Sequence, residues 1–147
     1  MGDIMNMNSK DLLNSIVKTS QMGQIGIRSV LNSSVHQDLR TELQAQLDGY
    51  DHMEREAIEI AASKGWKVDE LNPMIKTMTN LMTKTRLRFG NTDSKAAAMM
   101  IRGNMKGIIK GNKNLNHSKC SDERISHLQA KLIRHEEQYT KQMQGFL

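Results

Sequence analysis

A glycine follows a cation three times, at a spacing of four residues, in the run 102–111 (RGNMKGIIKG). Residues four apart lie nearly above one another on an α-helix, so these glycines would form a smooth ridge along one face. Each glycine inside a helix costs about 1 kcal/mol relative to alanine, and a second backbone packed unusually close is the simplest feature that offsets this cost. We therefore predict that Gly103, Gly107 and Gly111 are sites of close helix packing, within the chain or at a homodimer interface.

The composition of the chain favours helices. Its 147 residues include 12 methionines but only one proline, two phenylalanines, two tyrosines and one tryptophan. Long unbranched side chains are good helix formers, whereas the aromatic residues that favour strands are scarce. An aromatic fraction of 3% also argues against a nucleic-acid surface that stacks single-stranded bases. The predicted fold class is all-α, with one domain over residues 1–147.

Apolar residues recur at helical spacing along most of the chain. The pattern predicts helices at roughly 9–32, 35–64, 73–89, 93–112 and 121–145. Asn8 with Asp11, and Ser34 with Gln37, have the spacing of capping-box pairs at the start of the first two helices. Gly65 is placed as the glycine that ends the second helix.

Short connections separate these segments. Asn72-Pro73 has the form of an N-cap followed by a proline at the first helical position. The polar stretch 112–119 predicts a loop, and Ser121 an N-cap for the last helix. Four long helices, with the half-length helix 73–89 placed before the third long one, predict an antiparallel four-helix bundle.

Basic residues are concentrated in one part of the chain. Residues 64–119 hold 12 lysines and arginines against three acids, whereas the overall net charge is only +5. Arg102, Lys106 and Lys110 form a stripe beside the glycines and are candidate anion-binding residues. The other cations that could contact nucleic-acid phosphates with them are Arg86, Arg88, Lys113 and Lys119. A solvated basic face is the simpler interpretation of this stripe.

A metal centre is the chemistry that a four-helix bundle most readily suggests. Di-iron bundles need a Glu from each of two helices and a Glu-x-x-His pair from each of the others, and no Glu-x-x-His occurs here. Glu54 and Glu136 lie on or beside the predicted core stripes, and His135 adjoins Glu136, so a reduced site for one transition-metal ion is an alternative. Hydrogen-bonded carboxylates at the edge of the core are the simpler interpretation.

Several short motifs together resemble a family of bundle proteins. They are Met22-Gly23, the runs 38–43 and 46–50, the run 97–103, and His135-Glu136-Glu137 with Met143 and Leu147. In this combination they are similar to small ferritin-like bundle proteins of clostridia and related Gram-positive bacteria, and the Gly-Trp turn in 61–66 is similar to one in spore-coat protein F. The resemblance implies a ferritin-like four-helix bundle with no established activity.

These observations favour an interaction protein over an enzyme. No phosphate-loop, dinucleotide or nucleophile motif is present, and the lone Cys120 excludes an intrachain disulfide. The longest apolar run, 96–101, is too short to span a bilayer, so we expect a cytoplasmic protein without membrane insertion. We expect it to be non-enzymatic and to act through protein–protein contact or self-association, as a homo-oligomer or with a protein partner. The alternatives are a degenerate ferritin-like metal-binding protein and an anion- or nucleic-acid-binding module that uses the basic half.

Overall fold

The computed structural model describes residues 7–68 and 92–147, and within these ranges the regular structure is helical. The helices are α1 (Ser9–Leu31), α2 (Gln37–Ser63), α4 (Thr92–His117) and α5 (Glu123–Gln144). The short helix predicted at 73–89 lies outside the described residues. No helix in the described ranges is both long enough and apolar enough to cross a membrane.

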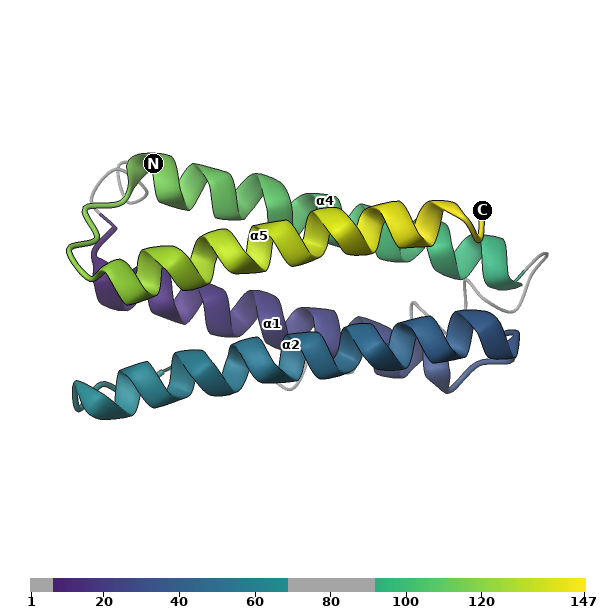
Figure 1. Cartoon of the computed structure of the whole chain (residues 1–147), viewed down its shortest axis with the longest axis horizontal. Helices are drawn as coiled ribbons and strands as arrows, with labels where there is room; N and C mark the ends of the chain where they lie inside the picture. The colour runs from purple at the N-terminus through teal and green to yellow at the C-terminus, as the bar shows by residue number, and fades with distance from the viewer. Residues whose placement is uncertain (1–6, 69–91) are drawn as a thin grey trace.

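The four helices lie side by side as a bundle (Figure 1). α1 packs most extensively on α2, and α4 packs most extensively on α5. Figure 1 shows that the helices of each pair run in opposite directions, whereas α2 and α4 run in the same direction. The end of α2 and the start of α4 therefore lie at opposite ends of the bundle.

The core lies between the two helix pairs and contains side chains from all four helices. The apolar stripe expected for the first helix is buried, as is the one expected for the last helix. The buried stripe residues of α1 are Leu13, Ile16, Val17, Ile27 and Val30. Those of α5 are Ile125, Leu128, Leu132, Glu136, Tyr139 and Met143. Helical periodicity therefore identified the inward faces, including the one acid that α5 turns inward.

Two predicted helix ends have the expected geometry. The Asn8 side chain accepts from the Asp11 N–H, and the Asp11 side chain accepts from the Asn8 N–H, which completes a capping box. Gly65 ends α2 with a φ of +68°, a conformation that glycine adopts without steric cost. The Trp66 N–H donates to the Ala61 carbonyl at 2.9 Å, which closes the backbone turn after α2.

Two helix starts differ from the prediction. α2 begins after His36 without a side-chain cap, so the predicted Ser34–Gln37 capping box is wrong. The His36 N–H instead donates to Asp93 Oδ1 at the start of α4. α5 is capped by Asp122, one residue later than predicted.

The predicted loop 112–119 is mostly helix, because α4 continues to His117. The reason is a buried tertiary contact. Asn114 is buried, and its side-chain amide donates to the Ser15 hydroxyl of α1 at 2.8 Å. A polar residue that finds such a partner is compatible with a helix that local propensity alone would end earlier.

Candidate functional site

A pocket of about 410 Å³ lies against α1 and α4. Its volume is within the range of small-molecule sites. α1 supplies Met22, Gly23 and Gly26, and α4 supplies Met99 and Met100, so much of the wall is apolar or lacks a side chain. Two of the wall glycines leave space here, because an added Cβ at Gly26 would meet only Met100 Sδ at 3.9 Å and one at Gly103 would meet nothing within 4 Å.

Three buried polar residues from three different helices also line this pocket: Tyr50 of α2, Asn104 of α4 and Glu136 of α5. Each is at most 2% exposed. The Tyr50 hydroxyl oxygen lies 2.9 Å from Asn104 Oδ1 and 2.8 Å from Glu136 Oε2. Residues separated by 86 positions in the sequence thus meet at one phenol group.

The number of protons defines how this cluster is paired. A phenol has one proton, so Tyr50 can donate in only one of its two contacts. If the Glu136 carboxyl group is protonated, it donates to the Tyr50 oxygen, and Tyr50 donates to Asn104 Oδ1. Both contacts are then hydrogen bonds. Loss of the proton would leave Tyr50 donating to the carboxylate and facing the Asn104 oxygen with no proton between them.

The environment of Glu136 favours the protonated form. Burial raises the pKa of Glu136 from 4.5 to about 8, and the Tyr50 hydroxyl opposes this rise only in part. Burial also raises the pKa of Tyr50 well above its ordinary value, with a further rise caused by the Glu136 charge. The uncharged form of the cluster therefore predominates at neutral pH.

Two atoms of this cluster have no hydrogen-bond partner among the described residues: Glu136 Oε1 and Asn104 Nδ2. In the protonated arrangement Oε1 is a carbonyl acceptor, and Nδ2 is an amide donor. Buried polar groups are normally paired, and an unpaired one costs free energy. One acceptor and one donor are therefore available beside the pocket.

Cations surround the mouth of the pocket. Lys106 and Lys110 of α4 are exposed and line it, and Lys18 of α1 lines it half-buried. Arg102, the third member of the predicted basic stripe, is exposed but does not line the pocket. Glu136 is the one acid among the described lining residues, and it is buried.

The three glycines of the predicted ridge have different surroundings. An added Cβ at Gly107 would lie 2.7 Å from Glu136 Cδ, and one at Gly111 would lie 2.8 Å from Ile133 Cγ1. Both glycines therefore pack closely on α5. Gly103 makes no such contact, because a Cβ there would meet nothing within 4 Å. It lines the pocket instead.

The three residues predicted as alternative metal ligands have other partners. Glu54 accepts hydrogen bonds from the side-chain amides of Gln21 and Gln24, at 2.9 and 2.8 Å. The His135 ring nitrogen lies 3.1 Å from the Tyr139 hydroxyl oxygen, and Glu136 pairs with Tyr50. In residues 7–68 and 92–147 no three His, Cys, Asp or Glu side chains come close enough to hold a metal ion. Among the described residues Glu54, His135 and Glu136 therefore do not form the single-metal site that was the alternative prediction.

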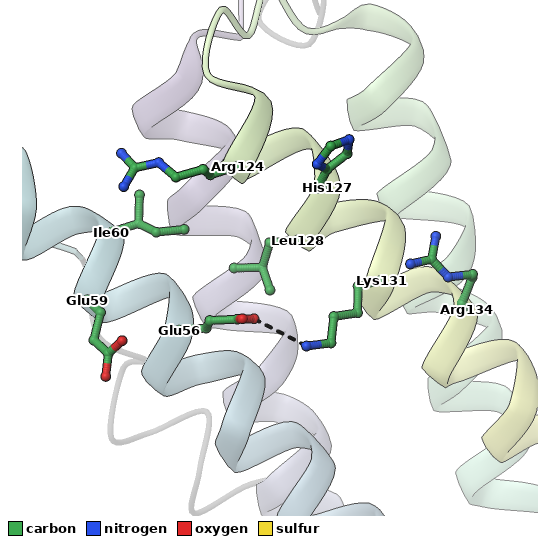
Figure 2. A pocket seen from close by; sticks show the side chains of 8 residues that line it. All are labelled: Glu56, Glu59, Ile60, Arg124, His127, Leu128, Lys131 and Arg134. Carbon is green, nitrogen blue, oxygen red and sulfur yellow. Dashed lines mark ion pairs between the residues drawn. The ribbon is translucent and has the colours of Figure 1, made fainter.

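A second hollow, of about 480 Å³, lies between α2 and α5 (Figure 2). Glu56 of α2 points toward Lys131 of α5 across it, and Lys131 Nζ lies 3.5 Å from Glu56 Oε2. Its charged side chains are exposed or half-exposed and carry both signs. The charges of this surface groove partly offset one another, whereas the pocket against α1 and α4 is lined by residues with buried unpaired polar atoms, so that pocket is the stronger candidate site.

Sequence reasoning identified part of this site. It placed Glu136 on or beside a core stripe and named Lys106 and Lys110 as candidate anion-binding residues, a role that stays a prediction, but it did not single out Tyr50. The sequence does place Tyr50, Asn104 and Glu136 on the apolar stripes of three different helices. Because buried polar groups are normally hydrogen-bonded, this placement could have predicted that the three residues pair with one another. Gly23 is also part of the site, because its missing side chain lets the Tyr50 ring approach α1.

The sequence matches no protein-family model, and no curated protein is significantly similar to it. Functional inference therefore depends on the geometry of the chain.

Proposed function

We propose that this protein is a non-enzymatic helical bundle that binds a small amphipathic molecule in the pocket against α1 and α4. The observation that carries this proposal is the pair of unpaired polar atoms, Glu136 Oε1 and Asn104 Nδ2, in residues that line a pocket whose walls also hold methionines, glycines and lysines. Small-molecule sites typically combine apolar walls with a few polar groups that orient the ligand.

Binding without turnover is the simpler role for this site. No His, Cys or Ser is present among the described residues that line the pocket. The acid that does line it is engaged with Tyr50, and the lysines lie at the exposed mouth. Thr19 and Tyr50 supply the hydroxyl groups of this lining, and the Tyr50 hydroxyl is buried and already engaged with Glu136 and Asn104. Binding is therefore the role that these residues support best.

The test uses a glycine of the pocket wall that can accept a side chain. Gly103→Leu adds a bulky group where a Cβ meets nothing within 4 Å, so the substitution narrows the pocket without disturbing the core. It also removes a helix-interior glycine, which is expected to stabilise the fold slightly. Gly103→Ala is the matched control, because it gives most of the helix-propensity gain and adds only one methyl group.

Binding is followed with the anionic fluorescent amphiphile 1-anilinonaphthalene-8-sulfonate, and folding with circular dichroism. We expect saturable binding to the wild type and to Gly103→Ala, and an affinity weaker by about tenfold or more in Gly103→Leu at equal helicity. If Gly103→Leu bound the probe as well as the wild type, the pocket would not be the site.

Self-association is a second candidate function, supported by exposed apolar side chains on α4. Met105 and Ile109 are 42% and 51% exposed and lie four residues apart on that helix. Neighbouring exposed apolar residues of this kind are common at protein interfaces. Native mass spectrometry of the wild type and of Met105→Lys/Ile109→Lys tests this candidate. A dimer that the substitutions dissociate would support it, and a monomeric wild type would refute it.

The helix directions support the ferritin-like part of the resemblance. A bundle in which α2 and α4 run in the same direction needs one connection from end to end, as ferritin-like folds have. We therefore propose a ferritin-like bundle that lacks the di-iron ligand set and has a ligand pocket beside its core. Binding of nucleic acid through Arg102, Lys106 and Lys110 remains a prediction, and a salt-dependent loss of retention on a polyanion column would test it.

A further inference from the structure

The charge of the pocket mouth indicates which kind of head group it accepts. No ion pair joins Lys106 or Lys110 to an acid of the described residues. Both side chains are exposed at the mouth, and the acid that lines the pocket, Glu136, is buried and paired with Tyr50. The mouth therefore attracts anions. No arginine is present among the described lining residues, so an anion here would be held by the point charges of lysines and not by two parallel hydrogen bonds.

The walls and the buried polar atoms indicate the rest of the ligand. Besides the lysines, the pocket is lined by Met22, Met99 and Met100, which adapt readily to apolar chains. Glu136 and Asn104 also line it, and the buried Glu136 Oε1 acceptor and Asn104 Nδ2 donor have no partner among the described residues. A purely apolar ligand would leave both atoms unpaired, whereas a hydroxyl or amide group would pair with them.

We propose that the ligand is an amphipathic carboxylic acid whose carboxylate is held by Lys106 and Lys110 and whose far end carries a hydroxyl or amide group that pairs with Glu136 and Asn104. This inference rests on the proposed binding function and names the chemistry of the occupant. The carboxylate remains at the exposed mouth, where little desolvation is needed. The hydroxyl or amide group at the far end of the ligand would form hydrogen bonds with Glu136 Oε1 and Asn104 Nδ2, which are otherwise unpaired.

The test compares three small molecules with the same ten-carbon chain. One carries both polar end groups, and each of the other two lacks one of them. The probes are 10-hydroxydecanoate, decanoate, which lacks the hydroxyl, and 1,10-decanediol, which lacks the carboxylate. Each is titrated in low salt at neutral pH as a competitor of 1-anilinonaphthalene-8-sulfonate. We expect 10-hydroxydecanoate to bind about tenfold more tightly than decanoate. We also expect it to bind about threefold to tenfold more tightly than the diol, an advantage that added salt reduces.

Two variants assign these preferences to the two ends of the pocket. Lys106→Gln/Lys110→Gln should abolish the preference over the diol and keep the preference over decanoate. Arg102→Gln/Lys113→Gln is the matched control, because it removes the same charge from exposed positions of α4 that do not line the pocket. Asn104→Leu, which keeps the side-chain size, should abolish the preference over decanoate and keep the preference over the diol.

The outcomes separate this inference from the proposed function. If decanoate or the diol bound as tightly as 10-hydroxydecanoate, or decyl phosphate bound more tightly than both acids, the assigned ligand chemistry would be wrong although a pocket exists. If Lys106→Gln/Lys110→Gln and its control Arg102→Gln/Lys113→Gln changed the binding preferences equally, the role of Lys106 and Lys110 would also be overturned. If no probe competed and Gly103→Leu left fluorescence unchanged, the binding function itself would fail.

Discussion

Gly107→Ala is expected to destabilise the protein, although replacing a helix-interior glycine with alanine normally does the opposite. A Cβ at this position would lie 2.7 Å from Glu136 Cδ, and closer still to both carboxyl oxygens. Carbon atoms in contact prefer about 3.5–4.0 Å, so the carboxyl group would have to move by about 1 Å. A flexible carboxyl end could do so easily at the surface. Glu136, however, is 2% exposed and lies 2.8 Å from the Tyr50 hydroxyl oxygen.

The size of the effect follows from three contributions. Forcing an extra group into a packed site costs about 1–3 kcal/mol. Displacing Glu136 from Tyr50 leaves buried polar atoms unpaired, which costs about 1–3 kcal/mol more. The higher helix propensity of alanine offsets about 1 kcal/mol of this. The free energy of unfolding should therefore fall by about 3 kcal/mol.

Urea unfolding followed by circular dichroism measures the change, with Gly103→Ala as the matched control. Gly103 lies one turn earlier on the same helix, and a Cβ there meets nothing within 4 Å. This variant should gain up to about 1 kcal/mol. In addition, Glu136→Ala should remove most of the cost of Gly107→Ala when the two are combined. Equal stability of the two glycine variants, or a cost that persists without the Glu136 side chain, would refute the reasoning.

Three further predictions concern protonation and helix capping. Between the unfolded and folded pKa values of Glu136, 4.5 and about 8, the native state retains a proton that the unfolded chain loses. The stability from this group is therefore complete below 4.5 and is lost as pH rises through 8, by up to about 1.4 kcal/mol per pH unit. Glu136→Gln should flatten this slope in urea unfolding, and parallel curves would contradict it. Tyr50→Phe removes the hydroxyl that lowers the pKa of Glu136, so the carboxyl carbon should titrate at higher pH in NMR spectra, and an unchanged midpoint would exclude this coupling. Asp122→Ala should cost about 1–2 kcal/mol through loss of the α5 N-cap, whereas Asp122→Asn should keep most of the cap. Equal thermal destabilisation of these two variants would show that charge pairing with Arg124 and Lys64, which holds the pKa of Asp122 well below its usual range, matters more than capping.

Prediction from the sequence is reliable where the controlling interactions are local. The capping box at Asn8 and the left-handed Gly65 involve residues within a few positions of each other, so their residue types were sufficient to predict them. The same method failed at the end of α4. There the contact between Asn114 and Ser15 of α1 joins residues 99 positions apart, and local propensity contains no signal for it.

By itself, the sequence determined that the described parts of the chain form amphipathic helices, and which face of each turns inward. Period and capping are properties of single segments, so no knowledge of the partner helix is needed. Only the tertiary structure decided that Tyr50, Asn104 and Glu136 meet, that Gly107 and Gly111 pack on α5 while Gly103 borders a pocket, and that Glu54 pairs with Gln21 and Gln24. These outcomes depend on how the inward faces cross and interdigitate, and that arrangement is set by the packing of all the helices together.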